Sequence, residues 1–157
     1  MIAKILDFEE GFSPVPYLCS EGYVTIGLGT KLHSEKDQDP SKFLLVINRE
    51  TAYVWLKREV KDVEDRILRG SHAETYKMQP RPVQHIILSM GYQLGYSGLF
   101  KFKNMWKKLD AHDYDGAADE ALDSKWYTQT PQRAFRHAGV IRVRNMSPYA
   151  GLIEGVL

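Results

Sequence analysis

The side chains best suited to acid–base chemistry lie close together near the start of the chain. Glu10 offers a carboxylic acid, Cys19 a polarisable thiol and Thr25 a hydroxyl, each separated from the next by only a few residues. A carboxylic acid can donate a proton to a leaving group, and a thiol or hydroxyl can hold a water or act as a nucleophile. This stretch therefore holds the parts of an acid–base site, which the remaining sequence has to position.

The pattern around Glu10 predicts a short helix that ends beside this acid. Apolar residues at Ile2, Ile5 and Leu6 recur at helical spacing. Gly11 is a natural stop, because glycine takes a left-handed backbone conformation at little steric cost. Glu10 then falls in the last turn, where the helix dipole mildly disfavours an acid. An acid placed against local preference favours a functional role, although an isolated glutamate is usually a surface acid.

The segment that carries the thiol and the hydroxyl predicts a β-hairpin. Residues 15–19 and 23–27 are typical of strands, and residues 20–22 of a glycine-containing turn. Cys19 and Thr25 lie symmetrically about this turn, so pairing of the strands would bring their side chains together. Taken singly, the cysteine is typical of a small buried hydrophobe, and the threonine of a simple strand preference.

The sequence after the hairpin predicts mainly helices. The polar residues 30–41 indicate a loop or hairpin extension, and residues 43–47 form an apolar run of undefined type. Asn48 is a good N-cap, and apolar residues recur at helical spacing from there to Gly70, which predicts a helix of about twenty residues. Such a helix is typical of a connector between two lobes, and equally of an ordinary core helix. Further helices are expected at Pro82–Leu94, at Phe102–Leu109, at Tyr114–Leu122 and from Pro131 onward.

Composition limits the class of protein. The chain has 157 residues and a formal net charge of +1, so we expect one globular domain, or two small lobes with a shared core, and no nucleic-acid footprint. The single cysteine excludes an internal disulfide, and no stretch is apolar enough for stable membrane insertion. The 5 histidines show no metal-ligand spacing, so we expect no metal and no cofactor. Acids interrupt the first apolar run, which is therefore unlike a signal peptide.

The residues around the acid, thiol and hydroxyl resemble the catalytic motif of the phage-type lysozymes, glycoside hydrolase family 24. The resemblance rests on Glu10-Gly11, on Tyr17 and Cys19, and on the run Gly22-Tyr23-Val24-Thr25-Ile26-Gly27-Leu28-Gly29. A second segment is similar to one in the T-even branch of that family: Trp126-Tyr127-Thr128-Gln129-Thr130-Pro131-Gln132-Arg133. The segments Met90–Gly95 and Gly98–Phe100 look like that branch too. The resemblance covers residues 1–30 and 47–143, whereas residues 31–46 and 144–157 match poorly.

This resemblance implies an α+β, mostly helical fold, with a small β-hairpin lobe and a larger helical lobe joined by the long helix. The β-containing lobe is expected at residues 12–47, the connecting helix at 48–70, and the helical lobe at 71–157 together with the helix at 1–11. Residues 1–157 would then form a single lysozyme-like domain, and we expect a monomer.

The resemblance also implies roles for individual residues. Glu10 is expected to donate the proton, with Cys19 and Thr25 as the other catalytic residues. Many relatives carry an aspartate that orients a water where this chain has Cys19, so three roles are open: a water-orienting thiolate, a covalent nucleophile, or a spectator beside Thr25. Arg133 is expected to pair with Glu10 and support it. Four positions are expected to bind substrate: Lys31, Tyr92, Met105 and Glu120. Of these, Tyr92 fits the apolar core of its helix equally well, and the last two replace smaller or amide side chains.

The expected activity is that of a muramidase, an endolysin that hydrolyses the β-1,4 bond between N-acetylmuramic acid and N-acetylglucosamine in bacterial peptidoglycan and lyses the host cell. Without a signal peptide, the enzyme would stay in the host cytoplasm until a separate membrane-pore protein gives it access to the cell wall or periplasm. A catalytically silent peptidoglycan-binding relative is one alternative. A cysteine peptidase using Cys19 and a histidine is another, although no peptidase motif surrounds this cysteine.

Overall fold

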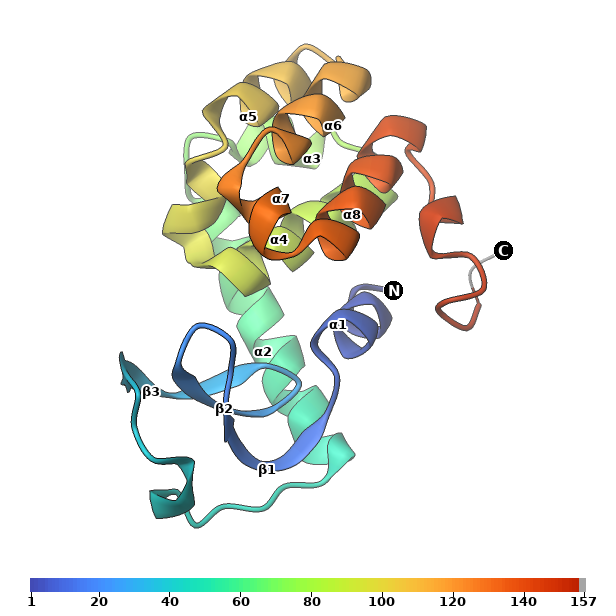
Figure 1. Ribbon diagram of the computed structural model, residues 1–157. Helices are drawn as coiled ribbons and strands as arrows, with labels where there is room; N and C mark the ends of the chain where they lie inside the picture. Colours follow the sequence, from blue (N-terminus) through green and yellow to red (C-terminus); the bar gives the residue numbers. More distant parts are fainter. Residues whose placement is uncertain (156–157) are drawn as a thin grey trace. The chain divides into compact units, whose positions relative to one another are not determined.

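The computed structural model describes residues 1–155 and contains a small antiparallel sheet together with many helices (Figure 1). The strands are β1 (Ser13–Leu18), β2 (Tyr23–Gly27) and β3 (Thr30–Lys36). The α-helices are α1 (Ile2–Glu10), α2 (Arg49–Leu68), α3 (Ala73–Lys77), α4 (Arg81–Phe100), α5 (Lys103–Asp110), α6 (Tyr114–Leu122), α7 (Lys125–Gln129) and α8 (Pro131–Val143). Short 3-10 helices are η1 (Pro40–Lys42) and η2 (Ser147–Tyr149). The α+β, mostly helical class that the sequence predicts is confirmed.

Helix α1 ends at Glu10, as predicted. Gly11 has a φ of 69°, and its amide donates a hydrogen bond to Asp7 O at 3.1 Å, which closes the last turn. Ile5 and Leu6 are fully buried and form the apolar face of the helix. The chain leaves this turn directly into β1, so Glu10 is positioned by the helix on one side and the sheet on the other.

The sheet has the strand order β1–β2–β3, and both pairs are antiparallel. Thr25 in β2 lies opposite Tyr17 in β1. A hairpin symmetric about Gly22 would instead place Cys19 directly opposite Thr25, and this symmetric register is wrong. The turn closes between Cys19 and Gly22, whose amide donates to Cys19 O at 2.9 Å, and the amide of Cys19 donates to Tyr23 O at 2.9 Å. The position of the turn along the chain therefore offsets the pairing from the symmetric one.

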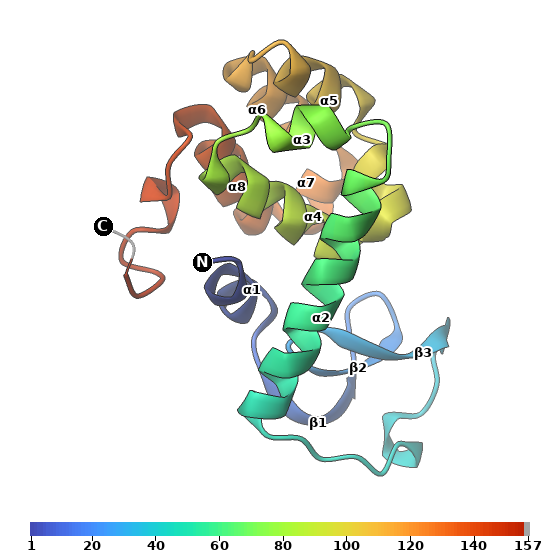
Figure 2. The ribbon, with the colours of Figure 1, turned by 180° about the vertical axis from the view of Figure 1, so that it is seen from behind.

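The segment after β2 continues the sheet, because the expected loop or hairpin extension forms β3 as far as Lys36. The chain then passes through η1 and an extended segment that leads to α2 (Figure 2). Leu44 and Val46 in this segment are 96% and 75% exposed, whereas Ile47 is buried. The apolar run at 43–47 is thus neither helix nor strand, and one of its side chains contributes to the core.

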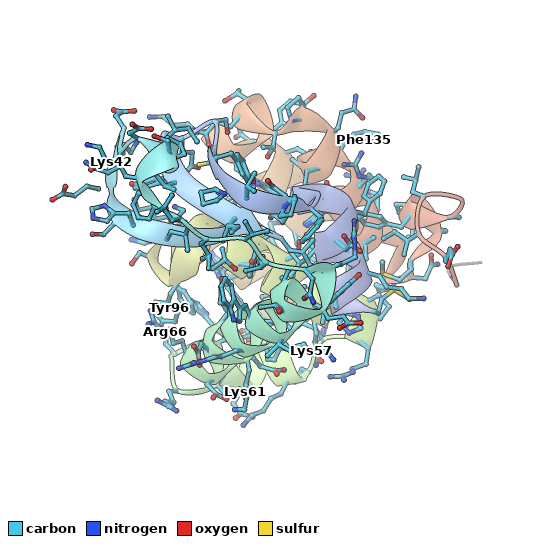
Figure 3. All side chains as sticks on the ribbon, turned by 90° about the horizontal axis from the view of Figure 1, so that it is seen from below. Lys42, Lys57, Lys61, Arg66, Tyr96 and Phe135 are labelled. Carbon is cyan, nitrogen blue, oxygen red and sulfur yellow. The ribbon has the colours of Figure 1, made fainter. Side chains whose placement is uncertain are left out.

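Helix α2 begins at the predicted N-cap, where Asn48 Oδ1 accepts a hydrogen bond from the amide of Thr51 at 2.8 Å. Its buried apolar residues recur at helical spacing: Ala52, Leu56, Val60 and Ile67. Lys57 and Lys61 point into solvent (Figure 3), and Lys61 pairs with Asp65 at 2.7 Å. The helix has 20 residues, which confirms the length expected from the sequence.

The chain divides into two compact units. The smaller unit, Ala3–Glu59, contains most of α1, the sheet and the first part of α2. The larger unit contains Met1–Ile2 and the chain from Val60 onward. This division falls within α2 and groups most of α1 with the sheet, whereas we expected α1 with the helical lobe. The expected lobe boundaries stay a prediction.

The core of the larger unit surrounds α4, whose first half supplies many buried side chains: Val83, Ile86, Ile87, Leu88 and Met90. Gly91 lets α2 approach closely, because a Cβ there would lie 2.6 Å from Val63 Cγ1. Gly95, with a φ of 71° and a ψ of 167°, kinks α4 at the expected break, after which the helix resumes. Helix α6 packs against α5 and α8, and α7 packs against α8 (Figures 1 and 2).

Some elements of the larger unit were not predicted. Helices α3 and α7 have 5 residues each, too few for hydrophobic periodicity to reveal them. Helix α7 begins at Ser124, whose hydroxyl accepts a hydrogen bond from the amide of Tyr127 at 3.3 Å. Helix α8 runs to Val143 and is longer than the short helix expected after Pro131. Beyond it, η2 places Tyr149 in the core, fully buried.

Candidate functional site

The carboxyl group of Glu10 lies against the backbone of Gly29, within the smaller unit. A Cβ built on Gly29 would lie 3.0 Å from Glu10 Oε2 and 3.3 Å from its Cγ, so a side chain there would force the carboxyl group to shift. Gly29 also has a φ of 95°, a conformation that L side chains rarely adopt. The end of α1 and the turn after β2 thus form a narrow cradle for the carboxyl group.

One face of the β1–β2 hairpin carries Tyr17, Cys19, Tyr23 and Thr25. Because alternate residues of paired strands point to the same face, the register that puts Tyr17 opposite Thr25 gathers all four side chains. Thr25 is 3% exposed, and its hydroxyl donates to Tyr23 O at 3.0 Å. The same hydroxyl lies within hydrogen-bonding reach of the Cys19 sulfur and can turn its one proton from Tyr23 O toward a thiolate. The predicted meeting of Cys19 and Thr25 is therefore confirmed, as diagonal neighbours rather than as a direct pair.

Tyr17 connects this face to Glu10. Burial raises the pKa of the Tyr17 phenol, and the negative charges of Glu10 and Cys19 raise it further. Both charges act on the phenol because they lie near it, so the acid, the thiol and the phenol share one small region.

The surroundings of Cys19 favour its ionised form. Partial burial raises the pKa of the thiol, whereas hydrogen bonds from the backbone of Tyr23 and Glu21 and from the Thr25 side chain lower it. The Glu21 carboxylate raises it as well, but the hydrogen bonds outweigh both opposing effects, so the pKa of Cys19 lies below its ordinary value. A thiolate is a better acceptor for a water proton than a neutral thiol, so this environment suits a water-holding sulfur.

Lys31 belongs to the same sheet, where it lies opposite Thr25 in the β2–β3 register. Its ammonium nitrogen is 3.9 Å from the centroid of the Tyr23 ring and 3.6 Å from Glu21 Oε2. The side chain is 48% exposed, so these contacts orient it without removing it from solvent. Its role as a substrate contact stays a prediction.

The larger unit contains a pocket of ≈ 580 Å³ lined by parts of α4, α5, α6 and α7. Met105 and Glu120 both line it, so the fold brings together two of the predicted substrate-binding residues. Met105 and the neighbouring Trp126 are buried, whereas Glu120 is only half-buried. The other charged residues of the lining are Lys101, Lys103, Asp123 and Lys125. Such a combination of apolar and charged groups suits a ligand that has both kinds of surface.

Tyr92 and Arg133 lie elsewhere in the larger unit. Tyr92 is partly exposed on α4 and does not line the pocket. Arg133 is 6% exposed on α8, and its Nη2 donates to Ser89 Oγ at 3.0 Å and to Ser89 O at 3.2 Å. The pairing of Arg133 with Glu10 stays a prediction, because the two residues belong to different compact units.

Two histidines of the larger unit, His72 and His85, have surroundings that the structure defines. His72 stacks on Trp106 with ring centroids 4.5 Å apart. Burial and the positive charges of the N-terminus and Arg81 lower the pKa of His85 to about 4.

Across residues 1–155, no group of three or more His, Cys, Asp or Glu side chains could hold a metal ion. Over the same range, no helix combines the length and the apolar character needed to cross a bilayer.

The family model for phage lysozyme matches residues 7–146. The chain belongs to the phage lysozyme family. The matched range includes Glu10, Cys19 and Thr25 in the smaller unit and the whole lining of the pocket in the larger one.

The relatives of this phage lysozyme family member are distant. It is 27% identical to the pre-baseplate central spike protein Gp5 of Enterobacteria phage T4, over 94% of this chain and 28% of that protein. It is 24% identical to probable T4-type lysozyme 1 of Dictyostelium discoideum and 23% identical to probable T4-type lysozyme 2 of the same organism. In both of these comparisons the match covers 94% of this chain and 97% of the relative. The chain therefore spans nearly all of the T4-type lysozymes but only 28% of the spike protein.

Sequence reasoning missed residues that support the site. Gly29 and Tyr17 both stand in the motif, and that membership was a usable signal. The contact of Gly29 with Glu10 and the electrostatic effect of Glu10 on Tyr17 become visible only in the fold. Ser89 carries no such signal. Its contact with Arg133 joins α4 to α8 and depends on how those helices pack.

Replacing Thr25 with valine should raise the pKa of the Cys19 thiol, because valine keeps the branched shape but lacks the hydroxyl that stabilises the thiolate. The measurement is the ultraviolet absorbance of the thiolate during a pH titration, with Cys19→Ser as the baseline. Ser13→Ala, which removes a hydroxyl elsewhere in β1, should leave the titration unchanged. A thiol pKa in Thr25→Val equal to that of the parent would show that the hydroxyl does not stabilise the thiolate.

Proposed function

We propose that the chain is a muramidase that hydrolyses the β-1,4 bond between N-acetylmuramic acid and N-acetylglucosamine in bacterial peptidoglycan. The observation that carries this proposal is the carboxyl group of Glu10, held against Gly29 and close to the face with Cys19 and Thr25. A proton donor and a water-holding group in one small region are what glycoside hydrolysis requires. Membership of the phage lysozyme family supports the same chemistry.

The proposed reaction begins with proton transfer from Glu10 to the glycosidic oxygen. The bond between this oxygen and the anomeric carbon breaks as the proton arrives, and positive charge develops on the sugar ring. A water adds to the anomeric carbon and loses a proton, and solvent returns a proton to Glu10. The contact with Gly29 keeps the carboxyl group in one place, which lowers the entropic cost of reaching the transition state.

We assign the orientation of the attacking water to Cys19. The hydrogen bonds that favour the thiolate make the sulfur an acceptor for a proton of that water. Thr25 can hold the same water, since its hydroxyl lies against the thiol. This role corresponds to that of the aspartate in the relatives that the motif resembles.

Substrate contacts are proposed in both units. Met105 and Glu120 line the pocket of the larger unit, which has room for part of a saccharide chain or of a group attached to it. Lys31 and Tyr92 complete the proposed set. Arg133 is proposed to support Glu10.

The proposed biological role is that of an endolysin. The enzyme would act as a monomer on peptidoglycan, in the cell wall or periplasm, after a separate membrane-pore protein releases it from the host cytoplasm. Its formal net charge of +1 gives no reason to expect a nucleic-acid partner.

One observation favours a second setting for the same chemistry. The match to the phage central spike protein covers 94% of this chain and 28% of the spike protein. In that setting the enzyme would cut the wall as a component of a phage particle rather than cause lysis. Mass spectrometry of purified particles separates the two, because a particle component is present in a fixed ratio to other particle proteins and a free endolysin is absent.

Glu10→Gln should abolish clearing of permeabilised bacteria, with a loss of roughly a hundred-fold or more, because the amide cannot donate the required proton. The assay is loss of turbidity, with mass analysis of released fragments to locate the cut bond. Glu9→Gln, one residue away on α1, should remain active. Near-normal clearing by a folded Glu10→Gln protein would contradict the mechanism. A parent protein that binds cell walls without cutting them would instead indicate a catalytically silent peptidoglycan-binding relative. New amines in place of new reducing sugar ends would indicate a peptidase.

Substitutions of Cys19 separate its three roles. If the thiol orients water, Cys19→Asp keeps or raises the hydrolysis rate and Cys19→Ala lowers it roughly a hundred-fold. We expect this result, together with a loss of activity in the parent as pH falls below the pKa of the thiol. A covalent role predicts a thioglycoside detectable by mass spectrometry with a slow substrate, and a nearly inactive Cys19→Ser. A parental rate and pH profile in Cys19→Ala would remove any chemical role for the sulfur.

Gly29→Ala should lower the hydrolysis rate roughly a hundred-fold, because its methyl group would crowd the Glu10 carboxyl group and displace it from its reacting position. Gly11→Ala is the matched control: Gly11 has a φ of 69°, and a Cβ there meets nothing within 4 Å. Both variants should lose about 1–2 kcal/mol of stability through backbone strain, measured by chemical denaturation. Equal rates in the two variants would show that the cradle is not needed for catalysis.

A further inference from the structure

The larger unit contains a buried row of polar side chains in which only Arg133 has a part in the proposed mechanism. Arg133 Nη2 donates to Ser89 Oγ at 3.0 Å, and Ser89 Oγ lies 2.8 Å from His137 Nε2. His137 Nδ1 in turn lies 2.8 Å from the hydroxyl of Tyr149. These residues come from α4, α8 and η2, so the row joins segments that are far apart in the sequence.

The whole row is shielded from water. Ser89, His137 and Tyr149 are 0% exposed and Arg133 is 6% exposed. Phe135, on the same helix as Arg133, points outward and is 67% exposed, so the row occupies the inner face of α8 (Figure 3). Buried polar groups are costly unless they are hydrogen-bonded, and a buried guanidinium more than most. Water cannot replace the links of this row, so each side chain constrains the next.

The imidazole of His137 joins the two ends of the row through its two ring nitrogens. Burial, together with the charges of Arg133 and Arg136, holds the pKa of His137 well below its usual value. A neutral imidazole has one nitrogen that donates and one that accepts. The role of Nδ1 toward Tyr149 and that of Nε2 toward Ser89 are therefore linked, since only one of the two nitrogens carries the proton. Ser89 in turn accepts a hydrogen bond from the Arg133 guanidinium.

Packing keeps the C-terminal segment and the imidazole in fixed positions. The ring of Trp126 meets that of His137 edge-on, with centroids 5.6 Å apart, and the Tyr149 ring lies on another side at 6.1 Å. Pro148 sits closely on Gly139, where a Cβ would lie 3.1 Å from Pro148 Cγ. The hydroxyl of Tyr149 is thus held at one place relative to α8.

We propose that Tyr149 and His137 are positioning residues that orient the Arg133 guanidinium through Ser89. The segment after α8 would then tune the rate of hydrolysis although it contributes no catalytic residue. This inference rests on the proposed function, in which Arg133 supports Glu10. Tyr149 lies outside residues 7–146, the range that matches the family model, so the family match does not account for its place in the row.

The test compares two tyrosine hydroxyls in the same unit. Tyr149→Phe removes the end of the row and should lower kcat on soluble uncross-linked peptidoglycan roughly five-fold, the rate equivalent of one neutral hydrogen bond, with KM unchanged. Tyr76→Phe is the matched control, since Tyr76 is 2% exposed and its hydroxyl donates to Glu64 Oε1 at 2.7 Å. It should lower Tm by a similar amount and leave kcat at the parental value. A Tyr149→Phe enzyme with lowered Tm and parental kcat would overturn the proposal.

A double substitution separates positioning of Arg133 from a general loss of packing. In an Arg133→Lys background, which lacks the planar guanidinium, Tyr149→Phe should lower kcat no further. Ser89→Ala should lower kcat at least as far as Tyr149→Phe does in the parent, because it removes the link next to Arg133. An undiminished five-fold effect of Tyr149→Phe in the Arg133→Lys background would mean that the hydroxyl acts by another route.

Nuclear magnetic resonance of the side chains gives a result that does not depend on activity. The guanidinium protons of Arg133 should exchange slowly in the parent and faster in Tyr149→Phe, with a change in the ring-nitrogen shifts of His137, and Tyr76→Phe should match the parent. Unchanged Arg133 and His137 signals in Tyr149→Phe would show that Tyr149 does not position Arg133 through His137 and Ser89. If the parent does not cut peptidoglycan, the proposed function fails, and the proton-exchange result still decides whether Tyr149 positions Arg133.

Discussion

The register of the β1–β2 pairing is the constraint on which the proposed chemistry depends. Because Tyr17 lies opposite Thr25, the alternation of side chains puts the phenol, the thiol and the hydroxyl on one face of the hairpin. A slip of one residue would move Thr25 to the opposite face of β2. The turn that Gly22 closes on Cys19 fixes this register, and the fully buried Val24 and Ile26 on the other face of β2 hold it.

The position of the acid depends on a different kind of constraint, the absence of a side chain. Glu10 ends α1 because Gly11 turns the backbone, and its carboxyl group fits because Gly29 has no Cβ. The two glycines therefore have different roles: Gly11 allows the helix to end, and Gly29 allows the carboxyl group of Glu10 to approach the backbone. Glu10 and Gly29 are both only partly buried, so an added methyl group at this contact would act by displacing the carboxyl group rather than by disturbing the core.

In the larger unit, hydrogen bonds compensate the burial of a charged guanidinium group, that of Arg133. Arg133 is almost fully buried, and Ser89 accepts its hydrogen bonds through both its hydroxyl and its carbonyl oxygen. His137 and Tyr149 extend this set of hydrogen bonds to the C-terminal segment. A buried cation that is held so closely has a defined direction, which a solvated surface arginine does not have. Elsewhere in this unit, Met105 and Glu120 both line a pocket formed by parts of α4, α5, α6 and α7.

The amino-acid sequence by itself determined the elements that depend on near neighbours: the end of α1 at Gly11, the start of α2 at Asn48, and the presence of a hairpin. Caps, glycine conformations and hydrophobic periodicity are local properties, so residues a few positions apart are enough to predict them. The tertiary structure alone decided that Thr25 meets Cys19 diagonally, that Gly29 makes room for Glu10, and that Ser89, His137 and Tyr149 reach Arg133. The first depends on where the turn sets the strand register, and the second on how the turn after β2 meets the end of α1. The last depends on the packing of α4, α8 and η2, which lie far apart in the chain, and no spacing within one segment encodes how such segments fit together.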